Sequence, residues 1–131
     1  MHVLVADDEP HIGRIIKMKL EAGPFRVTLA FDGKQALETL AREPDIQLVL
    51  LDLMMPHLSG LDVLAAIRAD PRHADLPCII LTAAGQEAQH LRAREMGVNE
   101  FLTKPFSPKR LYQRAAELVG LAGDESEAGA S

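Results

Sequence analysis

Polar residues that could do chemistry follow four of the short apolar runs in this chain. They are Asp7 with Asp8, Asp52, Thr82 and Lys104. Asp52 is the hardest of these to explain by packing, because it ends the aliphatic run 48–51 and Pro56 soon prevents a strand from continuing. A buried strand that delivers one carboxylate to the edge of a sheet indicates a functional carboxylate.

If the carboxylates of Asp7, Asp8 and Asp52 meet, their charges must be compensated. Two unit charges about 4 Å apart repel by about 4 kcal/mol at an effective dielectric constant of about 20. One lysine cannot neutralise three acids, whereas Mg²⁺ suits a site of a few carboxylates that also takes a phosphate. Asp52 is then predicted to attack a phosphoryl group, helped by the cation and by Lys104. The product would be an aspartyl phosphate.

Each of these residues also has a structural interpretation. Asp8, just before Glu9 and Pro10, could cap a helix N-terminus. A threonine after a strand is a common cap, and a lone lysine is usually a solvated surface charge. The occurrence of all of them at four predicted strand ends favours the functional interpretation.

The elements that must position these residues alternate strictly between strand and helix. The strands are predicted at 3–6, 26–31, 48–52, 76–81 and 100–103. The helices carry inward apolar stripes, which in chain order are Ile12, Ile15, Ile16 and Leu20; Ala36, Leu37 and Leu40; Leu61, Leu64 and Ile67; Ala88, Leu91 and Met96; and Leu111, Ala115, Leu118 and Val119. This alternation predicts an α/β fold, a parallel sheet with helices on both faces and a ligand site at the carboxyl edge of the sheet.

The composition is that of one globular domain, with 131 residues of which 47% are hydrophobic. The net charge is −5, and three acids near the C-terminus supply much of it, so the folded part is too weakly charged to favour nucleic-acid binding. The single cysteine, Cys78, lies in an apolar run and is predicted to be a buried, inert thiol. No signal or membrane-spanning segment is predicted, which indicates a cytoplasmic protein. We expect a domain over 1–121 and a flexible tail or linker remnant over 122–131.

Together these residues resemble the receiver domain of two-component response regulators over residues 3–120. The matching motifs are Asp7-Asp8, Asp52 within DLMMPHLSG, Thr82-Ala83 and Lys104-Pro105-Phe106. The resemblance implies a three-layer, doubly wound, flavodoxin-like (βα)5 fold with a five-stranded parallel sheet in the order 2-1-3-4-5. It implies a phosphorylation-controlled signalling switch rather than an enzyme, in which Asp52 accepts a phosphoryl group from a histidine kinase or a histidine phosphotransfer protein.

The resemblance also implies roles for the remaining motif residues. Asp8, Asp52 and the backbone carbonyl of Met54 would bind Mg²⁺ (or Mn²⁺) directly, and Asp7 would act on the ion largely through water. The contacts to the phosphoryl oxygens would come from Thr82, Ala83 and Lys104. In this family the corresponding Lys-Pro peptide bond is usually cis, so the resemblance implies a cis bond between Lys104 and Pro105.

Thr82 and Phe101 would form the conformational switch of such a domain. Phe101 stands where tyrosine is common in the family, so it offers no hydroxyl for a hydrogen bond. Met54 and Ala84 occupy the positions that tune the lifetime of the phosphate, and neither has a polar side chain to orient a water, so we expect slow self-dephosphorylation. The helix over 86–96, the last strand and the last helix would form the signalling face, which would also be available for dimerisation.

Alternative functions remain open on the sequence alone. A haloacid-dehalogenase-like phosphohydrolase would also use an aspartyl phosphate, but it places a second acid two residues after the nucleophile, where this chain has Met54. A degenerate receiver would act only as an interaction module, although every expected acid is present. A nucleotide or flavin module would need a phosphate-binding loop in place of the acids at 7–9. The five histidines show no ligand spacing, and most are expected at the surface. The kinase and the output partner are unknown, and neither nucleic-acid nor membrane binding is expected of this chain.

Overall fold

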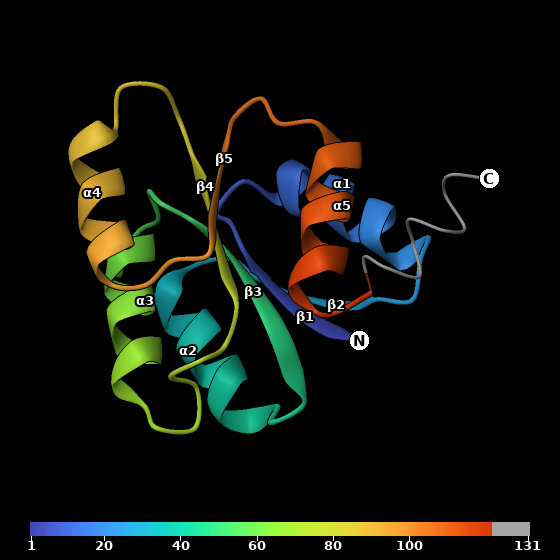
Figure 1. The fold of residues 1–131 in the computed structure, drawn as a ribbon, viewed down its shortest axis with the longest axis horizontal. Coiled ribbons are helices and arrows are strands. Elements are labelled where there is room, and N and C mark those ends of the chain that lie inside the picture. Colours follow the sequence, from blue (N-terminus) through green and yellow to red (C-terminus); the bar gives the residue numbers. More distant parts are fainter. Residues whose placement is uncertain (122–131) are drawn as a thin grey trace.

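A computed structural model describes residues 1–121, in which five parallel strands form one sheet between two layers of helices (Figure 1). The strands are β1 (His2–Ala6), β2 (Arg26–Ala30), β3 (Ile46–Asp52), β4 (Cys78–Thr82) and β5 (Glu100–Thr103). The helices are α1 (Pro10–Glu21), α2 (Gly33–Arg42), α3 (Gly60–Ala69), α4 (Glu87–Glu95) and α5 (Pro108–Leu118). The sheet order is β2-β1-β3-β4-β5, which confirms the predicted fold class. The predicted tail over 122–131 lies outside the described residues.

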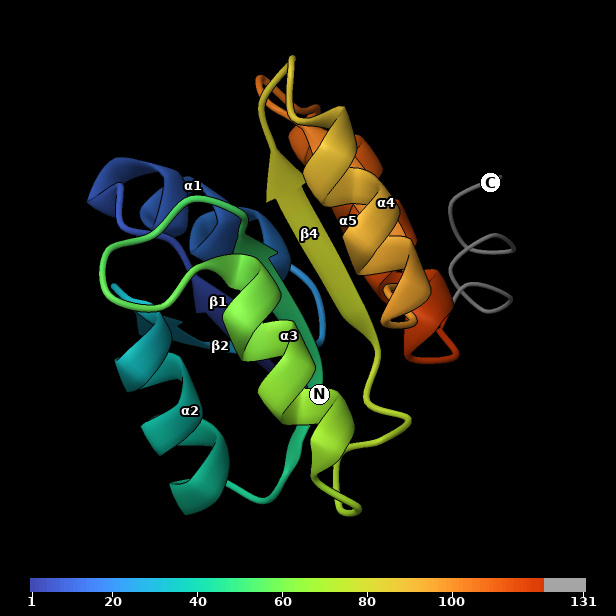
Figure 2. The same ribbon diagram turned by 90° about the vertical axis from the view of Figure 1, so that its left-hand side faces the viewer.

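The two faces of the sheet are covered by different helices. Helices α1 and α5 lie side by side on one face, and α2, α3 and α4 cover the other (Figures 1 and 2). Strand β3 contributes to both cores, because Leu48 and Leu50 pack towards the first pair while Val49 and Leu51 pack towards the second group. All four side chains are fully buried. The unbroken aliphatic run in the sequence is therefore that of a central parallel strand with no solvated face.

Local capping explains where several helices begin. The Asp32 side chain accepts a hydrogen bond from the Gln35 amide at 2.8 Å, and Ser59 forms a capping box with Asp62. Helix α5 begins with Ser107 as its N-cap and a proline in the first turn.

Helix α4 differs from the other helices, and its predicted inward stripe is wrong at Ala88 and Leu91, while Met96 at its C-cap packs against the core as predicted. Ala88 is exposed and Leu91 is 58% exposed, whereas the buried residue of this helix is Ala93. The helix has nine residues and only one of them is buried, so its packing relies on Ala93, on the His90 ring against Phe101, on Met96 at the C-cap and on polar contacts near its start. Ile15 of α1 is likewise exposed (46%), because the inward face of that helix is centred on Ile16 and Leu20.

Some strand limits also differ from the predicted ones. Strand β4 starts at Cys78 rather than at residue 76, since Pro77 has no amide hydrogen to donate to the ladder. Strand β2 ends at Ala30, and Phe31 is 44% exposed. None of the helices in the described part of the chain has the length and apolar character needed to cross a membrane.

Candidate functional site

The carboxyl ends of β1 and β3 bring four acids together. The two strands are neighbours, and Ala6 pairs with Leu51, so the residues that follow, Asp7 and Asp52, lie next to each other. One carboxylate oxygen from each of Asp7, Asp8, Glu9 and Asp52 lies within 4.8 Å of the others. Asp7 and Asp52 are buried (2% and 6% exposed), whereas Asp8 and Glu9 are exposed. The three acids singled out in the sequence therefore meet, and Glu9, which sequence reasoning did not include, joins them.

Lys104 extends into this cluster from the end of β5. Its Nζ lies 3.1 Å from Asp7 Oδ2 and 3.3 Å from Asp52 Oδ2. The same Nζ lies 3.0 Å from Glu9 Oε1. The backbone amide of Lys104 donates to the Thr82 carbonyl at 2.6 Å, which continues the β4–β5 ladder and directs the lysine to the same edge of the sheet. Within the described residues, one ammonium group thus faces the carboxylates of three residues.

This excess of negative charge changes the acid–base properties of the cluster. Burial, and after it the neighbouring Asp7 charge, raises the pKa of Asp52 to about 7 in the metal-free protein. The lysine is affected in the opposite sense. Burial disfavours its charge, but the hydrogen bond to Glu9 and the charges of Asp52 and Asp7 outweigh burial and raise the pKa of Lys104.

One buried oxygen in the cluster lacks a hydrogen-bond donor. Asp7 Oδ1 accepts from the Glu9 amide at 2.9 Å, and Asp52 Oδ1 accepts from the Met54 amide at 3.3 Å. Asp7 Oδ2 is buried and accepts no hydrogen bond from any described residue, because the ammonium of Lys104 lies near it but outside hydrogen-bonding geometry. Among the described residues, the charge near this oxygen is compensated by the Lys104 ammonium, which Glu9 and Asp52 share, so a hard divalent cation is a partner that the oxygen could still take.

The loop after β3 is held close to Asp52 by a glycine. The Gly60 amide donates to the Leu53 carbonyl at 3.0 Å, and a side chain at this position would place its Cβ 2.5 Å from the Asp52 carbonyl oxygen. The loop can therefore close tightly only with glycine at residue 60. Met54 is held beside the acids at the start of this loop, with its side chain 59% exposed.

At the end of β4, the predicted phosphoryl donors are already hydrogen-bonded to α4 and its N-cap. The Thr82 hydroxyl donates to Gln86 Oε1 at 2.8 Å, and the Ala83 amide donates to the same oxygen at 2.8 Å. Thr82 Oγ1 also lies 2.8 Å from Nε2 of His90. Sequence reasoning missed Gln86 and His90, although these two polar residues are four positions apart and therefore lie one helical turn apart on the same side of α4.

The remaining site residues surround this cluster. Phe101 is half-buried, its ring stacks on His90 with centroids 4.5 Å apart, and the Arg94 guanidinium lies 5.4 Å from the centroid of the same ring. The peptide bond between Lys104 and Pro105 is cis. Ala84, a proposed lifetime position, is exposed. Cys78 is fully buried, and burial raises the pKa of its thiol to about 11, as expected for an inert cysteine.

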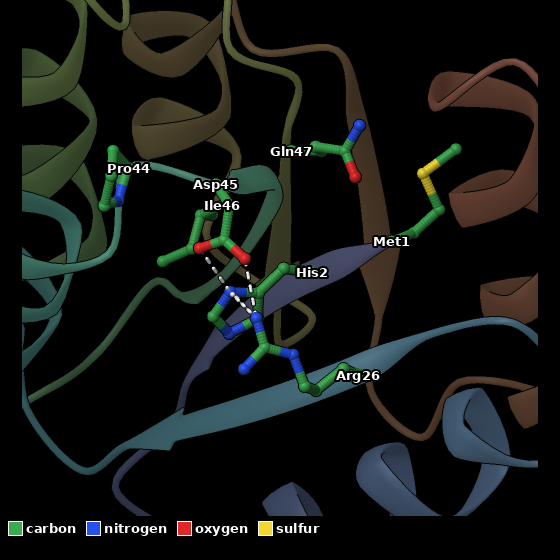
Figure 3. Close-up of a pocket in the computed structure, with 7 residues that line it drawn as sticks. All are labelled: Met1, His2, Arg26, Pro44, Asp45, Ile46 and Gln47. Atoms are coloured by element: carbon green, nitrogen blue, oxygen red, sulfur yellow. Dashed lines mark hydrogen bonds and ion pairs between the residues drawn. The ribbon is translucent and has the colours of Figure 1, made fainter.

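A second charged cluster lies at the opposite, amino end of the sheet (Figure 3). His2 is an exception to the expectation of surface histidines, since it is 3% exposed between the starts of the two neighbouring strands. Its Nδ1 lies 2.9 Å from Asp45 Oδ1 and its Nε2 lies 2.7 Å from Thr28 Oγ1. The Arg26 guanidinium donates to Asp45 Oδ2 at 2.6 Å. We interpret this cluster as structural, because every charge in it has a partner.

Comparison with known proteins gives consistent matches over most of the chain. A family model described as the response regulator receiver domain matches residues 3–116. The transcriptional regulatory protein SrrA of Staphylococcus aureus is 38% identical over 117 residues, which cover 89% of this chain and 47% of that protein. The chain thus spans about half the length of the curated relatives it matches.

Solved structures agree with this result. The receiver domain of a Francisella response regulator superposes with a TM-score of 0.81 at 36% identity, covering 91% of this chain and 96% of the other. A response regulator receiver domain protein from Clostridium thermocellum gives a TM-score of 0.83 at 31% identity, covering 91% and 94% of the two chains.

Proposed function

Because this chain belongs to the response regulator receiver domain family, we propose that it is switched by transfer of a phosphoryl group to Asp52 in the presence of a divalent cation. Receiver domains serve phosphorylation-controlled signalling and are phosphoacceptors rather than enzymes in the usual sense. The observation that carries the proposal is the charge imbalance at the strand ends, where four carboxylates meet a single lysine in the described part of the chain.

The donor set of the cluster fits Mg²⁺ or Mn²⁺. Carboxylate oxygens of Asp7, Asp8 and Asp52, with the backbone carbonyl of Met54, would hold the ion. The buried Asp7 Oδ2, which lacks a hydrogen bond and is paired with the shared Lys104 ammonium, supports a cation at this place. When bound, the cation would neutralise the acids and the charge that develops on the phosphoryl oxygens.

In the proposed transfer, a carboxylate oxygen of Asp52 attacks the phosphorus of a phosphohistidine. A bond forms between this oxygen and phosphorus, the phosphorus–nitrogen bond breaks, and its electron pair leaves with the imidazole of the donor. The attack requires ionised Asp52, so the pKa of about 7 would limit the nucleophile at low pH when no cation is bound. Lys104, already within reach of Asp52, would contact a phosphoryl oxygen.

The proposed response begins at the end of β4. Thr82 and the Ala83 amide would bind the remaining phosphoryl oxygens, and the Phe101 side chain would move with Thr82. Contacts of a charged group to Lys104 and Thr82 would be worth about 1.5 to 3 kcal/mol each. Their sum of roughly 3 to 6 kcal/mol is comparable with the roughly 5.5 kcal/mol needed to invert a 1:99 equilibrium. The α4–β5–α5 face would carry the signal and would be the surface for dimerisation.

The partners of the domain follow from the same proposal. A histidine kinase or a histidine phosphotransfer protein would supply the phosphoryl group. A downstream partner, or a further domain such as the remaining half of the curated relatives suggests, would read the state of the α4–β5–α5 face. With the apolar side chains of Met54 and Ala84 beside the site, the phosphate should be lost slowly.

The test is incubation of the protein with acetyl phosphate and Mg²⁺, followed by intact-mass measurement. We expect an adduct of about 80 Da that is absent in Asp52→Asn and in samples treated with a chelator. Asp45→Asn, which removes a carboxylate at the other end of the sheet, is the matched control and should be phosphorylated normally. Absence of the adduct in the wild type, or its persistence in Asp52→Asn, would contradict the proposal. Release of inorganic phosphate over many turnovers would instead favour the phosphohydrolase.

A further inference from the structure

One side-chain oxygen, Gln86 Oε1, receives hydrogen bonds from both Thr82 and Ala83. Both distances are 2.8 Å. The Ala83 amide can only donate, so the atom that faces it must be the amide oxygen of Gln86 rather than its nitrogen. The Thr82 hydroxyl has a single proton, and this proton is placed towards Gln86 Oε1 at 2.8 Å rather than towards the Ala83 carbonyl oxygen, which is 3.3 Å away.

This arrangement determines the role of His90. Since the proton of Thr82 is directed to Gln86, the Nε2 atom of His90 at 2.8 Å must donate to Thr82 Oγ1. The same imidazole stacks on the ring of Phe101, with an angle of 28° between the two planes. A continuous set of contacts therefore runs from Gln86 through Thr82 and His90 to Phe101, from the phosphoacceptor edge to the side of β5.

We propose that Gln86 and His90 form a latch on α4 that competes with the phosphoryl group for Thr82 and Ala83. The inference rests on the proposed function, because it takes these two donors as the phosphoryl contacts of β4. In the resting protein Gln86 Oε1 occupies both donors, as a phosphoryl oxygen would. The Thr82 proton cannot serve Gln86 and a phosphoryl oxygen together, so phosphorylation releases Gln86.

Release of Thr82 also affects His90, the second residue of the latch. When the Thr82 hydroxyl turns towards the phosphoryl group, it leaves Nε2 of His90, and among its side-chain contacts within residues 1–121 the imidazole keeps its stack on Phe101. His90 and Phe101 therefore move together. His90 is a positioning residue in this scheme, and it provides the polar link that the Phe101 ring cannot make.

Helix α4 is suited to respond to such a release. Its N-cap makes no side-chain hydrogen bond to the first turn of the helix, and among its residues only Ala93 is buried. Few apolar contacts hold the helix to the sheet, so the hydrogen bonds from the end of β4 are a large share of its attachment. Loss of these hydrogen bonds should therefore let α4 move. A similar loss would have less effect on α3, which has more buried residues.

The experiment measures the affinity of the full chain for beryllofluoride in Mg²⁺, a noncovalent phosphoryl analogue, by NMR titration. Gln86→Ala removes the competitor and should tighten binding about 3- to 10-fold, the effect of one typical hydrogen bond. Gln86→Glu keeps an acceptor at the same place and adds a negative charge, so it should weaken binding. Gln89→Ala is the control, because Gln89 lies on the same helix and its side chain makes no hydrogen bond or ion pair with the described residues.

His90→Ala supplies the second readout, the side-chain resonances of Phe101. In the wild type these resonances should shift when beryllofluoride binds. In His90→Ala they should differ from the wild type before addition and change little on binding. Unchanged affinity in Gln86→Ala, or a normal Phe101 response in His90→Ala, would overturn the latch while leaving the proposed function intact. Failure of the wild type to bind the analogue would overturn both.

Discussion

The two ends of the sheet each hold a charged cluster around buried titratable side chains, but the clusters are balanced differently. At the amino end, both ring nitrogens of His2 are within hydrogen-bonding distance of a partner, and Arg26 compensates Asp45 (Figure 3). At the carboxyl end, the acids outnumber Lys104, and Asp7 Oδ2 lacks a hydrogen bond from any described residue. Both clusters arise from residues at strand termini.

The balance of positive and negative charge distinguishes a structural cluster from a functional one better than the residue types in the cluster do. His2, Glu43 and Asp45 also form a group with metal-ligand chemistry, yet the guanidinium of Arg26 already neutralises Asp45. At the other end, burial and after it the neighbouring Asp7 charge raise the pKa of Asp52 to about 7, so the ionised forms of these two acids oppose each other in the folded protein. Repulsion between buried acids lowers stability, and such an arrangement is typical of a site where a bound ligand compensates the charges.

The largest effect that we expect at either end is the loss of stability in His2→Ala. The substitution empties a buried position and leaves the Thr28 hydroxyl without its partner, which should lower the free energy of unfolding by about 2 to 3 kcal/mol. Urea unfolding followed by circular dichroism measures the change. Phosphorylation by acetyl phosphate should be unaffected below the unfolding transition. A loss of phosphorylation would break the distinction between the two ends.

Asp52→Asn should change the free energy of unfolding in the opposite direction, because it should stabilise the metal-free protein. The folded-state pKa of Asp52 is raised from 3.8 to about 7, so between these values the folded state binds more protons than the unfolded state. The free energy of unfolding of the wild type therefore falls as the pH rises through this window. The variant does not show this fall, because asparagine does not titrate. We expect a gain of about 2 kcal/mol at about pH 8 that disappears below about pH 4.

The matched control for this substitution is Asp45→Asn at the amino end. The hydrogen bond to His2 lowers the pKa of Asp45, so its ionised form favours the folded state above the unfolded-state pKa. Asp45→Asn should therefore give no gain at high pH. A gain there equal to that of Asp52→Asn would mean that the imbalance is not confined to the carboxyl end.

Addition of Mg²⁺ should stabilise the wild type by a smaller amount. A dissociation constant of about 1 mM would give about 1.4 kcal/mol at about 10 mM Mg²⁺. Thermal unfolding at matched ionic strength measures this shift, which should largely vanish in Asp52→Asn and persist in His2→Ala. The same shift in all three proteins would indicate a cation effect unrelated to the acidic cluster.

The smallest predicted effect is that of Arg26→Ala. The ion pair with Asp45 is short, but the two side chains are 63% and 53% exposed, so the loss should be about 0.5 kcal/mol. Chemical denaturation at low and high salt measures it, and salt should reduce the difference between variant and wild type. A much larger loss would mean that the guanidinium chiefly satisfies His2, whose Nδ1 lies 3.2 Å away.

Much of the fold could be predicted from local patterns. The aliphatic run of β3 and the alternation of strands and helices are properties of short segments, and the structure retains them. The acids at the strand ends could be predicted to meet because parallel strands have their carboxyl ends at one edge. The buried side of α4 could not be predicted in this way, because the weak apolar pattern of the helix did not identify Ala93 as its one buried residue.

Contacts between distant segments had to come from three-dimensional packing. The burial of His2 depends on β1 lying between β2 and β3, and the participation of Glu9 depends on the reach of Lys104 from β5. The engagement of Thr82 by Gln86 depends on the angle at which the chain leaves β4. Periodicity reports which face of an element is apolar, whereas register, crossing angle and rotamer determine which polar atoms meet. For this reason residue types indicated the chemistry, and packing alone selected the partners of each charged atom.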